Sequence, residues 1–194
     1  MASSLNRSTA ILLIVVTLTV PVSSAHAEDP AIPLQLQAEL TAKVVEYAQS
    51  PSSQGLSVMR IGILVRSGSV ESQHFATELK AIFGRMGTIA GLAHEEVLMT
   101  WSTPTAFVEE ARRRQLFAVY LTPGLRGEIP AVARALEGAQ IISVAAVDSY
   151  VSGGAILGFE LVSGRPRMVL NLSQARKQGV AFRAQVMKLM RIVD

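Results

Sequence analysis

The sequence contains no cysteine among its 194 residues. Disulfides, thiol redox sensing, cysteine nucleophiles and structural Cys/His zinc sites are therefore all excluded. Only two histidines, His74 and His94, follow residue 27. Histidines that lie 20 residues apart in a sequence are more typical of ordinary surface or half-buried positions than of a metal pair. The sequence therefore predicts neither a metal site nor a cofactor.

The chain also has little net charge and no recognisable catalytic motif. Its formal charge of +3 is too small to indicate a nucleic-acid partner. No Gly-x-Ser-x-Gly nucleophile elbow is present, and Ser67-Gly68-Ser69 lacks the lysine and glycine spacing of a P-loop. Glu95-Glu96 and Glu109-Glu110 are adjacent acids, whose side chains diverge on a helix or strand. We therefore predict a protein that is not an enzyme.

The first 27 residues have the pattern of a secretory signal peptide. Arg7 precedes an uncharged apolar run from Ala10 to Val20, which is followed by Pro21 and by Ala25-His26-Ala27. The apolar run is roughly half as long as a membrane-spanning helix, so a retained anchor is the less favoured interpretation. We predict cleavage after Ala27, which leaves one domain, residues 28–194, with no membrane span and a formal charge of +2.

Helix and strand signals alternate along this domain. Helices are expected over residues 34–47, 70–85, 104–114 and 129–136. Strands are expected over residues 58–65, 116–121 and 140–144, and a further strand is expected to end with residues 97–100. Four strands that alternate with helices predict parallel crossovers. The fold class is therefore α/β, a single-domain three-layer sandwich with a mostly parallel central sheet flanked by helices.

A predicted antiparallel hairpin completes the sheet at one edge. Its strands are residues 155–162 and 167–172, and Ser163-Gly164-Arg165-Pro166 has the residue types of a turn. A helix is expected to begin at Ser173, because a serine oxygen can accept a hydrogen bond from a first-turn N–H. A last helix is expected around Val186–Met190.

The loops after the strands are the predicted ligand site, because ligands of open α/β sheets bind beyond the carboxyl ends of the strands. The favoured interpretation of the hydroxyl groups there is helix capping by Ser69 and Thr103. The alternative is a shallow pocket for a small anionic or polar ligand, covered by the only tryptophan. For Asp148 a turn role is favoured over catalysis. The residues of this alternative site are Ser67, Gly68, Ser69, Trp101, Ser102, Thr103, Thr122, Gly124 and Asp148.

Gly153-Gly154, just before the hairpin, also allows two interpretations. The favoured one is that the glycines allow the backbone to turn into the following strand, whose apolar face completes the core. The other is that a neighbouring apolar surface binds a partner protein or a second copy of the chain. Its residues would be Tyr150, Phe182, Met187 and Met190.

The order of several motifs resembles the YfiR-like family of exported proteins, which is also catalogued as a domain of unknown function. The resemblance extends from residue 34 to the end. It depends mainly on Ile142-Ser143-Val144, Gly153-Gly154, Gly158-Phe159-Glu160, Val169-Leu170-Asn171-Leu172 with Ala175 and Gly179, and Val186–Met190.

The resemblance implies a periplasmic regulator without catalytic residues. The best-known member represses a membrane diguanylate cyclase by binding its periplasmic sensor region, which lowers cyclic-di-GMP signalling. That member's disulfide-linked redox control cannot operate in a chain without cysteine. The expected partner is a membrane sensor protein, with a diguanylate cyclase as the specific class and a homodimer as a further association. A periplasmic protein that binds small solutes at the strand-end loops is the alternative.

Overall fold

The computed structural model describes residues 30, 32–49 and 55–194. The predicted signal segment, residues 1–27, lies outside the described residues. Within them, no helix is both long enough and apolar enough to cross a bilayer.

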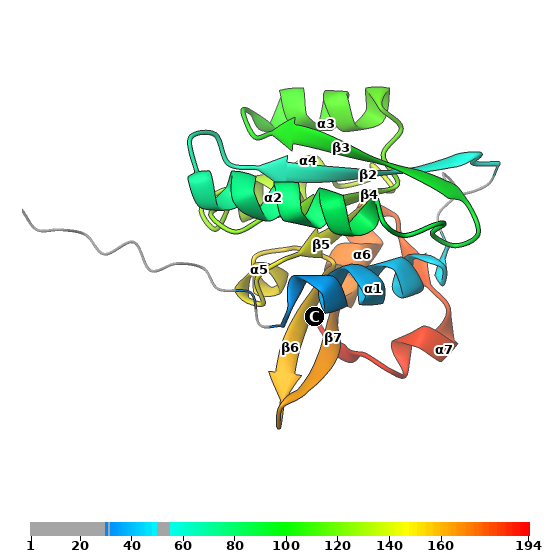
Figure 1. Ribbon diagram of the computed structural model, residues 1–194. Coiled ribbons are helices and arrows are strands. Elements are labelled where there is room, and N and C mark those ends of the chain that lie inside the picture. Colours follow the sequence, from blue (N-terminus) through cyan, green and yellow to red (C-terminus); the bar gives the residue numbers. More distant parts are fainter. Residues whose placement is uncertain (1–29, 31, 50–54) are drawn as a thin grey trace, which may run out of the picture.

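The centre of the molecule is a seven-stranded sheet with the strand order β3-β2-β4-β5-β6-β7-β9 (Figure 1). Adjacent strands from β3 to β6 are parallel, β6 and β7 are antiparallel, and β9 is parallel to β7. Every residue of β4 and β5 is buried, because helices cover both faces of the sheet at these strands. The strands are β2 (Val58–Val65), β3 (Ala93–Thr100), β4 (Ala118–Leu121), β5 (Ile142–Ala145), β6 (Leu157–Val162), β7 (Arg165–Asn171) and β9 (Arg191–Val193).

Helices cover both faces of this sheet. From β2 the chain crosses through α2 to the edge strand β3, and from β3 it returns through α3, past β2, to β4. Right-handed crossovers in opposite directions place α2 and α3 on opposite faces. In Figure 1, α1 and α2 pack side by side in front of the sheet, and α3 contacts α4 on the other face. The bounds are α1 (Leu34–Val45), α2 (Val70–Phe83), α3 (Pro104–Arg113) and α4 (Ile129–Ala135).

The predicted α/β sandwich and its late hairpin are therefore confirmed, with changes near the C-terminus. Helix α6 (Leu172–Gln178) begins after Asn171, whose Oδ1 accepts a hydrogen bond from the Gln174 N–H (2.8 Å), so Ser173 is not the cap. The last helix, α7 (Ala184–Met187), begins earlier than expected and is only four residues long. Strand β9 follows it and lies outside the hairpin.

Besides β9, three short elements were not predicted. Helix α5 (Ser149–Ser152) follows β5. Strands β1 (Ala48–Gln49) and β8 (Ala181–Phe182) form a separate two-stranded antiparallel sheet, which connects the end of α1 to the segment before α7. This small sheet holds the first and last parts of the described domain together.

A buried polar contact between two side chains joins α1 to the sheet. The hydroxyl of Tyr120 on β4 donates to the side-chain oxygen of Gln37, and the Gln37 Nε2 donates to the Ile32 carbonyl (3.0 Å). Phe75 packs against the Tyr120 ring at a centroid distance of 6.2 Å. Burial raises the pKa of Tyr120 well above its ordinary value, so the hydroxyl stays neutral and remains a donor.

Candidate functional site

The first two strand-end loops use their hydroxyl groups to cap helices. The Ser69 Oγ accepts a hydrogen bond from the Ser72 N–H (3.2 Å), and the Thr103 Oγ1 accepts one from the Ala106 N–H (3.2 Å). Each cap satisfies a donor that has no partner within its own helix. The capping interpretation of these two residues is therefore confirmed.

The order in which the chain adds strands reverses between β2 and β4, because β3 lies on one side of β2 and β4 on the other. Open α/β sheets most often bind ligands at such a switch point. Here the protein's own groups bridge the crevice. The Arg66 Nη1 donates to the Gly124 carbonyl (3.0 Å) across the gap. Below it, the Thr122 hydroxyl donates to the Leu64 carbonyl (2.7 Å) and lies 2.5 Å from the Ser72 hydroxyl. Thr122 is buried by these contacts and is not available to a ligand.

The residues of the predicted ligand site lie in several places. Trp101 packs against Phe107, with their ring centroids 5.6 Å apart. Ser102 lines a hollow beside α3, whereas Asp148 lines a different hollow with Asn171 and Arg191. Ser67 and Gly68 are exposed in the turn before α2.

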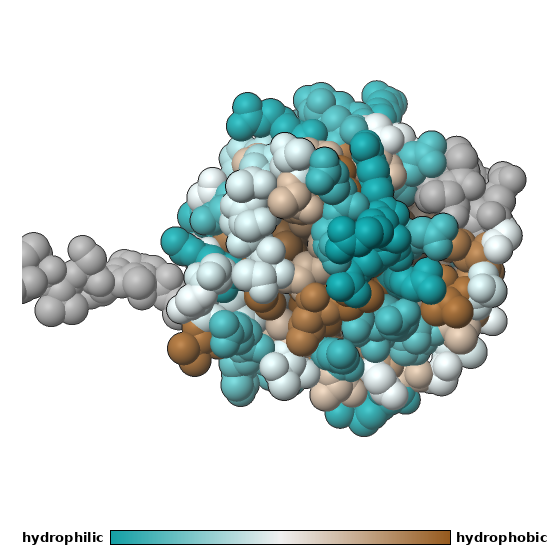
Figure 2. All heavy atoms as spheres, turned by 90° about the horizontal axis from the view of Figure 1, so that it is seen from above, coloured by the Kyte–Doolittle hydropathy of each residue, from teal (hydrophilic) through white to brown (hydrophobic). Residues whose placement is uncertain are grey.

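Viewed from above, the molecule shows the side that carries α3 (Figure 2). Hydrophilic side chains gather there and separate small apolar areas. The basic residues Arg112, Arg113 and Arg114 lie at the end of α3, and Glu110 pairs with two of them. This arrangement is that of a solvated helix end and offers no continuous apolar surface.

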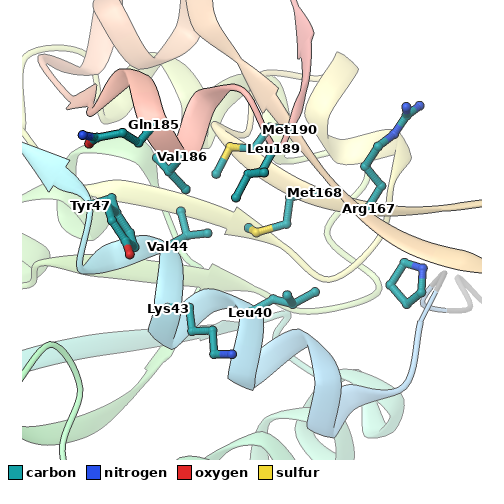
Figure 3. A pocket seen from close by; sticks show the side chains of 11 residues that line it. Leu40, Lys43, Val44, Tyr47, Arg167, Met168, Gln185, Val186, Leu189 and Met190 are labelled. Carbon is teal, nitrogen blue, oxygen red and sulfur yellow. The ribbon is translucent and has the colours of Figure 1, made fainter.

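A continuous apolar hollow does lie between α1, β7 and the α7 region (Figure 3). Its volume is about 340 Å³. We call it the α1–β7 groove. The residues that line it are Leu40, Lys43, Val44, Tyr47, Pro166, Arg167, Met168, Gln185, Val186, Leu189 and Met190.

The groove has an apolar centre and a polar margin. In Figure 3 the side chains of Leu40, Met168 and Leu189 converge on it, whereas the charged ends of Lys43 and Arg167 point away from its centre. Leu189 is 76% exposed, an unusual position for a leucine at the margin of an apolar hollow. The methionines are unbranched and adapt their shape to a bound surface.

The partner surface expected from the sequence agrees only in part with this groove. Met190 lines it, and Met187 lies beside it, packed against the core. Phe182 is buried and belongs to β8. Tyr150 is 1% exposed and its hydroxyl accepts a hydrogen bond from the Leu125 N–H (2.8 Å), so the surface role expected for it is wrong. Sequence reasoning missed Leu40, Tyr47, Pro166, Met168 and Leu189.

Beside the groove, an ion-pair cluster connects β6, β7 and β9. The Glu160 carboxylate accepts from the Nε of Arg167 (2.6 Å) and from the Nε of Arg191 (2.9 Å). Partial burial of the carboxylate opposes its ionisation, but the hydrogen bonds and charges of the two arginines outweigh this effect. They hold the pKa of Glu160 below its ordinary value of 4.5.

Fold and groove together define an α/β domain with an apolar groove beside its sheet. In the described residues, no group of three or more His, Asp and Glu side chains could hold a metal ion. The family profile described as YfiR/HmsC-like (DUF4154) matches residues 34–191. The chain belongs to this family of regulatory proteins. A search of curated proteins found no match.

Solved structures share the fold at low sequence identity. A substrate-binding protein with adhesive properties from Clostridium difficile, in a ligand-free open form, is 14% identical with a TM-score of 0.61; 85% of this chain and 61% of that chain are covered. The ABC domain from Streptococcus pneumonia in complex with L-Trp is 15% identical with a TM-score of 0.57; 83% of this chain and 62% of that chain are covered. A conserved domain protein from Vibrio cholerae is 16% identical with a TM-score of 0.58; 84% of this chain and 60% of that chain are covered. This chain thus spans about three fifths of each.

Proposed function

We propose that this protein is a non-enzymatic periplasmic regulator that binds the periplasmic part of a membrane signalling protein. A diguanylate cyclase is the partner class that the family resemblance suggests, so that binding would lower cyclic-di-GMP signalling. Membership of the YfiR/HmsC-like family supports the regulatory class. The α1–β7 groove is the observation that carries the proposal.

The groove has the features of a protein-binding site. A hollow that is apolar at its centre and polar at its margin resembles the arrangement of most protein interfaces, in which water is excluded from a few anchoring side chains. Leu189, 76% exposed, and Tyr47, 36% exposed, both line it. A partner helix or loop that inserts apolar side chains between them would bury both.

Binding of a small solute at the strand ends is less well supported. The crevice between β2 and β4 is bridged by the Arg66–Gly124 hydrogen bond, and the Thr122 hydroxyl is already used. Thermal unfolding in the presence of a metabolite panel would test this alternative. A ligand present at 100 times its dissociation constant would add about 2.7 kcal/mol of stability. We expect no such shift from the panel.

Capture of a membrane partner tests the main proposal. The tagged domain, residues 28–194, is incubated with detergent-solubilised membranes and the retained proteins are identified. We expect a membrane signalling protein to be retained, and the substitution Leu189→Asp to reduce its retention at least tenfold, because a carboxylate would have to be desolvated in the groove.

A matched control uses an exposed leucine on the opposite edge of the sheet. Leu98 on β3 is 49% exposed and does not line the α1–β7 groove. Leu98→Asp should leave retention unchanged. The proposal would be overturned if no membrane signalling protein were retained, or if both substitutions reduced retention equally while the thermal unfolding of the two variants stayed the same.

A further inference from the structure

The β6–β7 hairpin ends in a protruding apolar tip. In Figure 1 the two strands extend downward, beyond the helices, to a tight turn. Leu161 and Val162, the last residues of β6, are 52% and 40% exposed. Both side chains therefore keep about half of their surface in contact with solvent and lie outside the buried core.

The geometry of the turn holds these side chains in place. Ser163 and Gly164 both have positive φ, 51° and 74°, as a two-residue turn of type I′ requires. Cross-strand pairing sets Val162 opposite Arg165 and Leu161 opposite Pro166. Paired residues project from the same face, so Leu161 and Pro166 make one face of the tip apolar, and Val162 and Arg165 make the other amphipathic.

Basic side chains outnumber acidic ones on the hairpin and on β9. Arg165, Arg167 and Arg191 lie on these strands, and Glu160 on β6 is paired with Arg167 and Arg191. Asp194 lies next to β9 and lines a hollow with Glu160 and Arg191. In the whole sequence, residues 157–194 contain seven basic and two acidic side chains, whereas residues 28–156 contain ten basic and thirteen acidic ones. The small net charge of the protein therefore conceals a strong separation of charge along the chain.

We propose that the hairpin tip, residues 161–166, inserts into the surface of an anionic lipid bilayer. Exposed apolar residues at the end of a convex, cationic projection match the boundary between headgroups and acyl chains. A protein partner would instead need a recess complementary to the tip. The apolar stem of Arg165 would lie at the boundary while its guanidinium contacts lipid phosphates. The tip shares Pro166 with the lining of the α1–β7 groove, but this inference does not require the partner proposed for the groove.

Sedimentation with lipid vesicles tests the proposal on residues 28–194. We expect the protein to bind vesicles of phosphatidylcholine that contain one quarter phosphatidylglycerol, and to bind pure phosphatidylcholine much more weakly. Binding should fall as salt is raised, because ions screen the attraction. Absence of binding to the mixed vesicles at low salt would overturn the proposal.

Two variants separate the apolar and the charged contributions. The double substitution Leu161→Ser, Val162→Ser should weaken binding about tenfold, since partly buried apolar area is lost. Arg165→Gln should weaken it about fivefold, the effect of one cation near an anionic surface. Leu98→Ser, which changes a leucine of similar exposure on β3, should have no effect. Equal losses for the tip and the Leu98 variant would refute insertion of the tip.

The outcome can be distinguished from that of the groove experiment. Leu189→Asp should reduce retention of the membrane protein in detergent and leave the tip able to insert into vesicles. The tip double variant should retain the membrane protein in detergent and bind vesicles weakly. If the tip variant lost the detergent-solubilised protein and bound vesicles normally, the tip would be a protein contact and the lipid proposal would be wrong.

Discussion

At the scale of single residues, Gly154 meets two constraints at once. Its φ of +115° lies in a region that other residues rarely adopt, and a Cβ placed on it would lie 2.6 Å from the Cβ of Ala133 on α4. The glycine therefore lets the chain pass from α5 into β6 directly against α4. This explains the Gly153-Gly154 step by backbone geometry and close packing.

Gly154→Ala should consequently destabilise the fold by about 2–4 kcal/mol, the sum of backbone strain and of overpacking against α4. Urea unfolding at equilibrium measures the change. Gly87→Ala is the matched control, because nothing lies within 4 Å of a Cβ at that position; its effect should stay within about 0.5 kcal/mol. Similar unfolding midpoints for both variants would contradict this account of Gly154.

The helix-capping residues illustrate what single positions reveal without a structure. Ser69 and Thr103 could be identified as caps because each directly precedes an apolar periodic segment, and Pro104 marks the first turn of α3. Before α6, Asn171 and Ser173 are both good caps. The choice depends on where the hydrogen bonds of β7 end, which is a property of the sheet and not of the local sequence.

At the scale of elements, the Glu160 cluster holds three strands together. The pKa of Glu160 is lowered in the folded protein, so its contribution to stability is present above the unfolded-state pKa and is lost as the pH falls through the lower, folded-state value. Both arginines are more than one third exposed, so solvent screening limits the contribution to about 1 kcal/mol or less.

Glu160→Gln should therefore lower the unfolding free energy at pH 7 by up to about 1 kcal/mol. The difference between the variant and the wild-type protein should vanish as the pH falls well below 4.5, where both side chains are neutral. Urea unfolding at several pH values measures this convergence. A difference that grew toward acid pH would have the wrong sign and would exclude the ion-pair explanation.

The longer elements were predictable because each carries its own pattern of apolar residues. Strand β2 and helix α3 begin and end within one residue of the positions expected from that pattern. Strands β1, β8 and β9 contain two or three residues each, too few for any periodicity. Their existence depends on partners that are distant in sequence, which is why the sequence did not reveal them.

The groove was difficult to predict for the same reason. Its lining comes from three segments, residues 40–47, 166–168 and 185–190. In each, the apolar side chains look like ordinary core residues. Only the packing of α1 beside β7 leaves a hollow between them and places Leu189 at its margin. Met190 alone was identified beforehand, because it belongs to an apolar cluster close to the C-terminus.

At the scale of the whole molecule, the separation of charge along the chain defines two unlike regions. The last 38 residues are strongly basic and include the hairpin, α7 and part of the groove lining. A net formal charge of +3 averages over this difference and gives no indication of it. Both proposed contacts, with a membrane protein and with anionic lipid, lie in or beside this basic region.

We predict that residues 1–27 act as a signal peptide and are removed during export. Intact-mass measurement or N-terminal sequencing of protein isolated from the periplasm should give Glu28 as the first residue, as expected for cleavage after Ala27. Substitution of Ala27 by a large residue should leave the uncleaved precursor at the membrane. A protein that retains Met1 and remains in the cytoplasm would refute export, and with it the periplasmic setting of both proposals.

The small β1–β8 sheet has a consequence for the order in which the α1–β7 groove is assembled. It joins the end of α1 to the segment just before α7, and the groove is completed only when residues up to Met190 have reached α1. A chain that crosses the membrane from its N-terminus exposes α1 first and the closing segment last. On the proposed export route, the α1–β7 groove would therefore form only once almost the entire polypeptide has been delivered, and a partly translocated chain would lack it.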